Sequence, residues 1–352
     1  MQAIEFHGDE RLELVERPDP VPGEGELLIA PSAVGICGTD VEIFNGSLAY
    51  FRMGLARYPI VPGHEWTGVV VEVGRGVTGF APGDRVVGEV AIGCGVCVRC
   101  RAGRSHLCAR RTETGIVHMD GAMATRIVFP AAFAHRVDLP ARAAALVEPT
   151  SVALHAVRRG AVAGKSVLVV GAGPIGLLVA QCARAEGAAG VAITDHRHDR
   201  LTLAASLGFS LYDADPAVEM PRAWGDASAV EALTATAEAD RIDVAIVCAG
   251  GPAAVASAFD AVRPGGTVVA LGLSGAPTIP FDFDGLVVRD IDLIGVLGSV
   301  GYWKSAIELI ESRQVRAEPL VTRTFGLERT RDALAALAAP GTLKVLIEPC
   351  PT

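Results

Sequence analysis

At residues 166–176 the chain reads Ser-Val-Leu-Val-Val-Gly-Ala-Gly-Pro-Ile-Gly, and this stretch decides the fold of its middle part. The apolar run before Gly171 is typical of a parallel strand that is buried on both faces. Of the glycines, the first permits a tight turn, the second lets the backbone approach a pyrophosphate, and the third lets strand and helix pack closely. A helical run follows from Leu177. The pattern predicts a dinucleotide-binding turn, with these cofactor-binding residues: Gly171, Gly173, Pro174, Ile175 and Gly176.

A second strand strengthens this interpretation. Residues 191–194 are apolar and end in Asp195, nineteen residues after Gly176. An acid at this distance accepts hydrogen bonds from the adenosine ribose and repels a 2′-phosphate, so we expect NAD rather than NADP. Arg200 follows closely and is predicted to flank the adenine. The alternative, a glycine-rich turn that binds nothing, accounts for neither the flanking strand and helix nor the acid.

Alternating strands and helices continue after this unit. We expect strands at 242–248, 266–272 and 292–296, and a helix at 252–262. Such alternation predicts a parallel sheet with helices on both faces, the Rossmann type of α/β fold.

The N-terminal third has a different pattern. Short alternating strands at 2–6, 12–15, 26–30, 66–73 and 84–90 are separated by Gly and Pro turns, which predicts a small β-barrel. Near the C-terminus, residues 303–314 have the spacing of an amphipathic helix, and 342–347 return to strand.

Two short stretches in the barrel region carry metal-binding side chains. Residues 35–40 include Cys37, and residues 62–68 include His64 and Glu65. A lone Cys or His is more often a buried structural residue, but thiolate, imidazole and carboxylate together suit zinc. Three protein ligands with an open fourth position describe a catalytic zinc site, where the metal acts as a Lewis acid on an alcohol or carbonyl oxygen.

A second cluster has the spacing Cys-x2-Cys-x2-Cys-x7-Cys. Four thiolates this close together can enclose one tetrahedral zinc without an open position, so the cluster predicts a structural zinc site. Iron–sulfur ligation is the alternative, although nothing else in the chain suggests electron transfer. The four predicted ligands are Cys94, Cys97, Cys100 and Cys108.

Composition restricts the protein's class. The 352 residues carry a net charge of −9, which argues against nucleic-acid and anionic-membrane partners. The most apolar window, 167–185, is broken by glycines and proline, so we expect no membrane span. Eight cysteines without a recognisable signal peptide indicate a reducing, cytoplasmic location with thiols that bind metal.

Taken in order, these motifs resemble the zinc-dependent medium-chain alcohol dehydrogenase family. The resemblance covers essentially the whole chain and implies a GroES-like catalytic domain at 1–148 with 297–352, and a Rossmann NAD-binding domain at 149–296. The run from Val147 to His155 is similar to the polyol and sugar (sorbitol dehydrogenase-like) branch. The resemblance also implies a homo-oligomer, a dimer or tetramer, and a cofactor contact from Leu297.

The resemblance further implies roles for single residues. Classical members have a zinc-binding Cys where this chain has Glu148, so either Glu148 or Glu65 is expected to complete the zinc site. A helix N-terminal acid that only favours the helix dipole is the alternative for Glu148. Thr39 would relay a proton, and Asp40 would orient His64. Many relatives have His where this chain has Glu42.

These observations together predict an enzyme with two zinc ions per chain. It would use NAD to oxidise a secondary alcohol of a polyol, sugar or cyclitol to a ketone, reversibly. One alternative is a simple secondary alcohol or an amino-alcohol as substrate. The other is a catalytically inactive zinc- and dinucleotide-binding regulatory protein.

Overall fold

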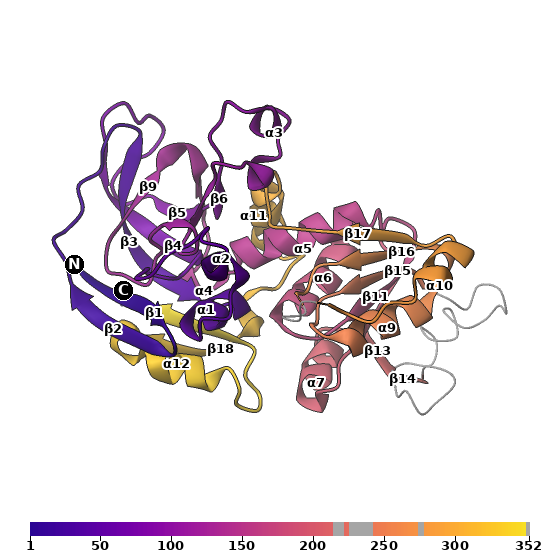
Figure 1. Cartoon of the computed structure of the whole chain (residues 1–352). Coiled ribbons are helices and arrows are strands. Elements are labelled where there is room, and N and C mark those ends of the chain that lie inside the picture. The colour runs from indigo at the N-terminus through magenta and orange to yellow at the C-terminus, as the bar shows by residue number, and fades with distance from the viewer. Residues whose placement is uncertain (214–221, 225–241, 274–277, 350–352) are drawn as a thin grey trace. The chain divides into compact units, whose positions relative to one another are not determined.

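The computed structural model of the protein describes residues 1–213, 222–224, 242–273 and 278–349, and it divides the chain into two compact units (Figure 1). Unit 1 contains Met1–Ser151, Gly298–Ser312 and Arg316–Thr352. Unit 2 contains Val152–Leu297 and Arg313–Val315. The divisions at 151 and 297 fall three residues and one residue after the expected boundaries at 148 and 296.

Unit 2 is built on a seven-stranded sheet in the order β14-β13-β12-β11-β15-β16-β17. All neighbouring strands are parallel except β13 and β14. Helices α6 and α7 pack on β11 to β13, and α9 packs on β11, β15 and β16 (Figure 1). The predicted parallel α/β fold is therefore confirmed. The elements are β11 (Ser166–Val170), α6 (Pro174–Ala185), β12 (Gly190–Thr194), α7 (His198–Ser206), β13 (Ser210–Asp213), β14 (Arg222–Trp224), β15 (Ile242–Val247), α9 (Pro252–Ala261), β16 (Val262–Ala270), α10 (Phe283–Val288) and β17 (Asp292–Gly295).

The predicted elements of unit 2 differ from the structure mainly at their ends. Strand β16 begins at Val262, four residues earlier than predicted, because Val262 already pairs with Ile242 before an irregularity in the register. Strands β13 and β14 were not predicted. Ser210–Asp213 has no long apolar run that would predict a strand. A strand near the edge of a sheet needs fewer buried side chains than a central one.

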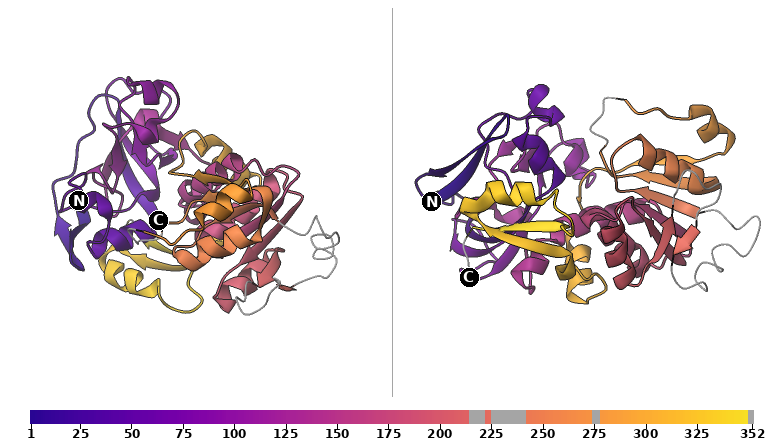
Figure 2. Two further views of the ribbon diagram at one scale, coloured as in Figure 1. Left: turned by 45° about the vertical axis from the view of Figure 1, so that its right-hand side comes forward. Right: turned by 90° about the horizontal axis from the view of Figure 1, so that it is seen from below.

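Unit 1 is built on a second sheet of seven strands, in the order β10-β5-β4-β3-β19-β18, with β9 also paired to β3. The C-terminal strand β19 lies between β3 and β18, so the last strands of the chain complete a sheet that residues 26–136 begin (Figure 2). The strands of unit 1 are β1 (Gln2–Gly8), β2 (Arg11–Glu16), β3 (Glu26–Gly35), β4 (Glu65–Val73), β5 (Arg85–Gly88), β6 (Ala91–Ile92), β7 (Thr112–Thr114), β8 (His118–Met119), β9 (Ile127–Pro130), β10 (Ala134–Arg136), β18 (Val321–Gly326) and β19 (Lys344–Glu348).

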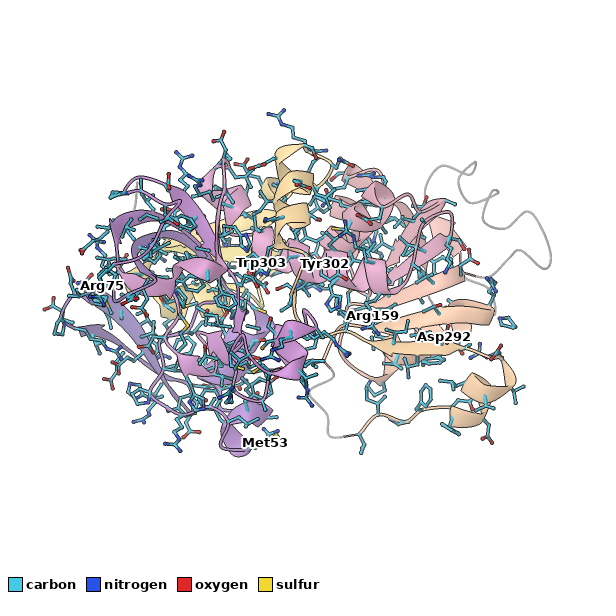
Figure 3. All side chains as sticks on the ribbon, turned by 90° about the horizontal axis from the view of Figure 1, so that it is seen from above. Met53, Arg75, Arg159, Asp292, Tyr302 and Trp303 are labelled. Atoms are coloured by element: carbon cyan, nitrogen blue, oxygen red, sulfur yellow. The ribbon has the colours of Figure 1, made fainter. Side chains whose placement is uncertain are left out.

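The helices of unit 1 are short, apart from the two that flank unit 2 in sequence. They are α1 (Gly38–Phe44), α2 (Ala49–Arg52), α3 (Val98–Arg101), α4 (Ala141–Ala144), α5 (Val147–Arg159, which continues into unit 2), α11 (Trp303–Glu311) and α12 (Thr330–Ala336). Tyr302 and Trp303 mark the start of α11 (Figure 3). The Trp303 ring stacks on His135 of β10, with the ring centroids 5.9 Å apart, and this contact ties α11 to the sheet.

Trp66 is the centre of the unit 1 core. It is 1% exposed and meets the Phe129 ring edge-on, with centroids 5.0 Å apart. A β-carbon at Gly88 would lie 2.2 Å from the Trp66 ring, so only glycine allows β5 to pass this close. The aromatic pair and the glycine thus fix the spacing of β4, β5 and β9, and β4 begins with one of the predicted metal ligands.

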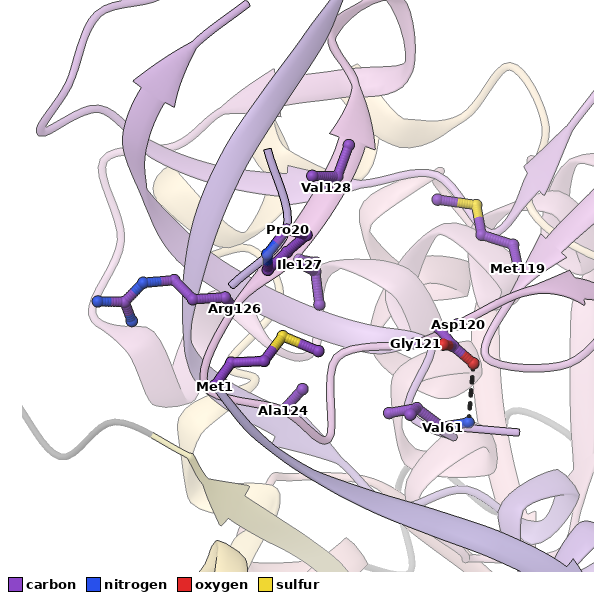
Figure 4. Close-up of a pocket in the computed structure, with 10 residues that line it drawn as sticks. All are labelled: Met1, Pro20, Val61, Met119, Asp120, Gly121, Ala124, Arg126, Ile127 and Val128. Carbon is purple, nitrogen blue, oxygen red and sulfur yellow. Dashed lines mark hydrogen bonds between the residues drawn. The ribbon is translucent and has the colours of Figure 1, made fainter. Parts of the chain in front are cut away.

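A small pocket of about 200 Å³ opens beside the N-terminus (Figure 4). Most of its lining is apolar, and Asp120 on its wall accepts a hydrogen bond of 3.0 Å from the Val61 backbone N–H. None of the predicted metal ligands or cofactor-binding residues lines it. Within the described residues, no helix is both long enough and apolar enough to cross a bilayer.

Candidate metal and dinucleotide sites

The register of two antiparallel strands brings the first metal-binding stretches together. Gly35, at the end of β3, pairs with Glu65, at the start of β4. Cys37 follows β3 by two residues and His64 precedes β4 by one, so both emerge at the same end of the pair. The Cys37 thiol, a His64 ring nitrogen and a Glu65 carboxylate oxygen all lie within 4.8 Å of one another. This donor set, with His64 and Glu65 buried and Cys37 half-buried, fits zinc, as the sequence predicted.

Asp40 fixes the positions of both stretches. Its fully buried carboxylate accepts hydrogen bonds from the backbone N–H of Cys37 at 2.8 Å and of Gly63 at 3.2 Å. It also lies 3.7 Å from His64 Nδ1. Burial disfavours a charged His64, but the negative charge of Asp40 and the contact with Cys37 outweigh burial and raise the pKa of His64 well above its usual value. At 3.7 Å the contact between Asp40 and His64 is longer than a hydrogen bond, so the buried carboxylate acts on the imidazole through its charge and makes it more basic.

A buried lysine that the sequence analysis missed contacts the same centre. Lys344 Nζ lies 2.8 Å and 2.6 Å from the two carboxylate oxygens of Glu65, and it also donates to the Ile36 carbonyl at 3.1 Å. Lys344 and Glu65 are 3% and 1% exposed. Glu65 is thus a metal-site residue whose charge is already paired. One feature of the sequence could have identified Lys344: it is a charged residue directly before the apolar run Val345-Leu346-Ile347 of a buried strand.

Glu148, the other candidate carboxylate, lies near this centre but outside the group of three. It is 8% exposed in the first turn of α5. Burial raises its pKa to about 7, while the positive charges of His64 and Lys344 oppose the rise. Glu148 is therefore close enough to interact electrostatically with the cluster. The choice between Glu65 and Glu148 as direct zinc ligand stays open.

Thr39 and Glu42 both lie in the short helix α1. Thr39 Oγ1 is 3.9 Å from Cys37 Sγ, next to the predicted ligands. Glu42 is half-buried, and burial raises the pKa of its carboxyl although Arg52 of α2 opposes the rise. Thr39 thus has a hydroxyl at the centre, whereas Glu42 has a cationic neighbour at its edge.

The four predicted structural ligands also converge. The thiols of Cys94, Cys97, Cys100 and Cys108 all lie within 4.8 Å of one another. Cys97 Sγ is 3.6 Å from Cys100 Sγ and 3.8 Å from Cys108 Sγ. Backbone N–H groups of Val96 and Cys97 lower the pKa of Cys94 to about 6 and so favour its thiolate. A closed set of four sulfurs is a suitable site for a tetrahedral metal, and the geometry by itself leaves both zinc and iron–sulfur ligation open.

The glycine-rich turn of unit 2 has the geometry that its sequence predicted. Gly171 has φ +107°, and a β-carbon at Gly176 would lie 1.7 Å from the Gly171 carbonyl oxygen. Helix α6 begins at Pro174 directly after Gly173. The free backbone N–H groups of such a helix start are suited to a phosphate.

Asp195 supports this turn from the end of β12. Its side chain is 3% exposed, and its oxygens accept hydrogen bonds of 2.8 Å from the backbone N–H groups of Ala172 and Arg197. Arg200 Nη1 lies 3.4 Å from the same carboxylate. Asp195 and Arg200 thus adjoin the glycine turn, as expected for an adenosine subsite. Leu297, at the end of unit 2, is 46% exposed, and its cofactor contact stays a prediction.

The Lys344–Glu65 pair generates a prediction about stability. Lys344→Met leaves an uncompensated buried carboxylate, so we expect a loss of about 3–5 kcal/mol in the free energy of unfolding. Urea denaturation measures this loss. The double variant Lys344→Met/Glu65→Gln should lose clearly less than the two single variants added together, because it leaves no buried charge unpaired.

The exposed Lys304 of α11 offers a matched control. Lys304→Met should change the free energy of unfolding by less than about 0.5 kcal/mol. If Lys344→Met costs no more than Lys304→Met, the buried pair does not stabilise the fold.

Known protein families match both units. Residues 23–140 match the family described as "Alcohol dehydrogenase GroES-like domain", and residues 174–312 match "Zinc-binding dehydrogenase". An L-threonine 3-dehydrogenase of Shewanella frigidimarina (strain NCIMB 400) is 33% identical over 343 residues, 96% of each chain. The relatives of this kind are not specifically of the polyol branch, so they support the family and not that branch.

Solved structures agree. A zinc-binding dehydrogenase of Sinorhizobium meliloti 1021 bound to NADP has a TM-score of 0.87 at 30% identity, with 99% of each chain covered. Galactitol-1-phosphate dehydrogenase of Escherichia coli has a TM-score of 0.83 at 26% identity, covering 99% of this chain and 100% of its own. With its GroES-like and Rossmann parts and its converging ligand sets, this chain belongs to the zinc-dependent medium-chain alcohol dehydrogenase family.

Proposed function

We propose that this enzyme uses NAD to oxidise a secondary hydroxyl of a polyol, sugar or cyclitol to a ketone. The observation that carries the proposal is the convergence of Cys37, His64 and Glu65 within 4.8 Å, beside Thr39. Zinc bound there would supply a Lewis acid that makes the substrate hydroxyl more acidic. NAD bound at the glycine turn of unit 2 would supply the hydride acceptor.

The chain's own residues have distinct parts in this reaction. Asp40 holds the backbone of both ligand-bearing stretches through the N–H groups of Cys37 and Gly63, and its charge faces His64. Lys344 balances the charge of Glu65, so that the buried centre does not carry an uncompensated carboxylate. The Thr39 hydroxyl receives the proton that the substrate loses and passes it outward. Glu42, half-buried beside Arg52, belongs to the rim of the site and stays outside the proton path.

Two relatives support a substrate that carries a nitrogen or an oxygen on the carbon next to the one that is oxidised. L-threonine has an amine next to its 3-hydroxyl, and galactitol 1-phosphate has hydroxyls on neighbouring carbons. The polyol proposal fits the second. A hydroxy amino acid is the second candidate, because the relative that is 33% identical over 96% of the chain is an L-threonine 3-dehydrogenase.

We also propose NAD over NADP. Asp195 accepts hydrogen bonds at the edge of the glycine turn, where its negative charge would repel a 2′-phosphate. The positive charge of the neighbouring Arg200 and the NADP-bound relative both act against a strict preference, so the ratio of kcat/KM with NAD to that with NADP is to be measured.

Cysteine usage, with thiols held for metal, supports a reducing cytoplasmic location.

A substrate panel tests the proposed activity. Galactitol 1-phosphate, sorbitol, myo-inositol, L-threonine and 2-butanol would be oxidised with NAD and with NADP, and kcat/KM would be compared. We expect a polyol, sugar derivative or cyclitol with NAD to be best, and Cys37→Ser to be inactive with all substrates although it is folded.

Other outcomes of the panel would replace parts of the proposal. A highest kcat/KM for L-threonine would identify an amino-alcohol dehydrogenase, and a highest value for 2-butanol would identify a simple secondary-alcohol dehydrogenase. Equal or better values with NADP would contradict the role of Asp195. No turnover, with NADH binding retained, would favour an inactive binding protein.

Thr39 and Glu42 make a matched pair for the proton path. Thr39→Val removes the hydroxyl at nearly constant volume and should lower kcat tens-fold or more, since general acid–base catalysis contributes about 10²–10⁴-fold. Glu42→Gln should change kcat by less than about threefold. A large loss in Glu42→Gln that formate or imidazole restores would place Glu42 in the relay.

We propose that the enzyme is a homo-oligomer that associates through unit 2. Strand β17 is last in the described part of its sheet, and exposed apolar side chains occur at residue 273 and within residues 281–297. An open apolar strand edge favours pairing with another chain, and a second copy offers the same edge. These side chains are Leu273, Phe281, Phe283, Val287, Val288, Leu293 and Leu297.

The oligomer proposal is tested by sedimentation velocity. Leu293→Lys places a charge on the edge strand (Figure 3 marks Asp292, where β17 begins) and should shift the protein toward monomer. The control Met53→Lys, at an exposed residue after α2 of unit 1, should leave the oligomer unchanged. A wild-type monomer at micromolar concentration would contradict the proposal.

A further inference from the structure

The lobe that carries the four cysteines has an unusual charge for this protein. Between residues 91 and 112 it contains five arginines and no acid, whereas the whole chain has a net charge of −9. Four thiolates around a divalent zinc leave a net charge of −2 at the centre of the lobe. The five arginines therefore lie in the same stretch of sequence as the thiolates whose charge they can offset. They are Arg99, Arg101, Arg104, Arg110 and Arg111.

Only some of these arginines reach the sulfur cluster or its loop. Arg110 Nη2 lies 3.3 Å from Cys94 Sγ, and the Arg110 backbone N–H lies 3.4 Å from Cys108 Sγ. Arg99 instead donates to the Leu107 carbonyl, and Arg111 pairs with Glu113. Arg104 is exposed. One residue, Arg110, thus contacts the first and the last cysteine of the motif.

The two contacts of Arg110 lie inside the loop that the antiparallel pairing of β6 with β7 closes, where Ile92 is opposite Thr112. Cys94 follows the short strand β6, and Cys108 lies fourteen residues later, after α3 and the turn at Ser105–Leu107. The contact of the Arg110 backbone N–H with Cys108 Sγ keeps residue 110 near the cluster. From there the Arg110 side chain is long enough to reach Cys94 Sγ. A guanidinium in this place neutralises thiolate charge and donates a charge-assisted hydrogen bond to sulfur.

We propose that Arg110 is a positioning residue of the four-cysteine metal site, where its side chain holds Cys94 against Cys108 and slows the loss of the metal. The inference rests on the proposed zinc-binding role of these four cysteines. Partners that hydrogen-bond to metal ligands commonly change metal affinity 10–100-fold when they are removed. Arg110 fits such a partner because it binds a ligand sulfur directly and lies outside the catalytic centre.

The test uses the full-length protein in a Cys37→Ser background, loaded with Co²⁺. In this background the four-cysteine site is the source of any thiolate-to-cobalt charge-transfer absorption. Arg110→Gln should move this band to lower energy, because the sulfur loses a positive neighbour and holds its electrons less tightly. A variant that merely loosens the lobe would broaden or lose the band without this shift. Arg110→Lys keeps the charge and should lie between wild type and Arg110→Gln.

Zinc release gives a second measurement on the otherwise wild-type enzyme. Transfer of zinc to a chromogenic chelator should be about 10-fold faster or more in Arg110→Gln than in wild type. The control Arg104→Gln removes an equal charge from the same lobe without a sulfur contact and should release zinc at the wild-type rate.

The possible failures are distinguishable. If Arg110→Gln and Arg104→Gln behave alike in both measurements, Arg110 has no special role and only the lobe's overall charge matters. If the Cys37→Ser protein shows no thiolate-to-cobalt band at all, the four cysteines do not form the proposed metal site. If Arg110→Gln does not fold, Arg110→Lys provides the test. A cobalt band and a zinc-release rate in Arg110→Lys equal to those of the wild type would show that the guanidinium's contact with Cys94 is not needed.

Discussion

A buried ion pair connects the two ends of this chain. Glu65 opens β4 near the N-terminus, Lys344 opens β19 near the C-terminus, and 279 residues separate them. Neither charge could remain in this interior alone, because desolvation of a single ion costs several kcal/mol. The C-terminal strand must therefore insert beside β3 for the N-terminal part to bury Glu65. Placement of Cys37 and His64 depends on the same strands.

Around this pair the centre is a network of compensating charges. Asp40 accepts hydrogen bonds from both ligand-bearing stretches and faces His64, while Lys344 faces Glu65. Glu148 is close enough for its pKa to rise to about 7. A site of this kind gains its affinity for a cation from carboxylates and a thiol that are held in place before the cation binds. The lysine limits the negative charge that the network accumulates.

Unit 2 is held together by a different constraint. Its central strands are buried on both faces, and its ligand-binding turn depends on backbone proximity between Gly171 and Gly176. Asp195 ties that turn to β12 through the Ala172 N–H, so the residue expected to contact the ribose also shapes the turn. The metal centre of unit 1 is thus held by paired charges, whereas the glycine-rich turn of unit 2 is held by apolar strands and glycine.

The motifs whose meaning is local could be predicted from sequence. The glycine turn, the four-cysteine spacing and the apolar strand before Gly171 each specify their geometry within a few residues, because short-range sterics and ligand spacing decide it. Cys37, His64 and Glu65 were recognised as residue types that bind zinc. Ends of strands, such as Val262 in β16, were less predictable because pairing with a neighbour decides them.

Contacts between residues far apart in sequence were decided only by the tertiary structure. Lys344 gives no sign of its partner in a sequence, since its role exists only when β19 lies beside β3 and β4. The contact of Arg110 with Cys94 arises because the lobe folds back on itself. The proximity of Glu148 to His64 and Glu65 likewise depends on where α5 begins relative to the sheet. Sequence determined which chemistry is available, and long-range packing decided which charges meet, because electrostatic energy depends on distance and burial that no local pattern encodes.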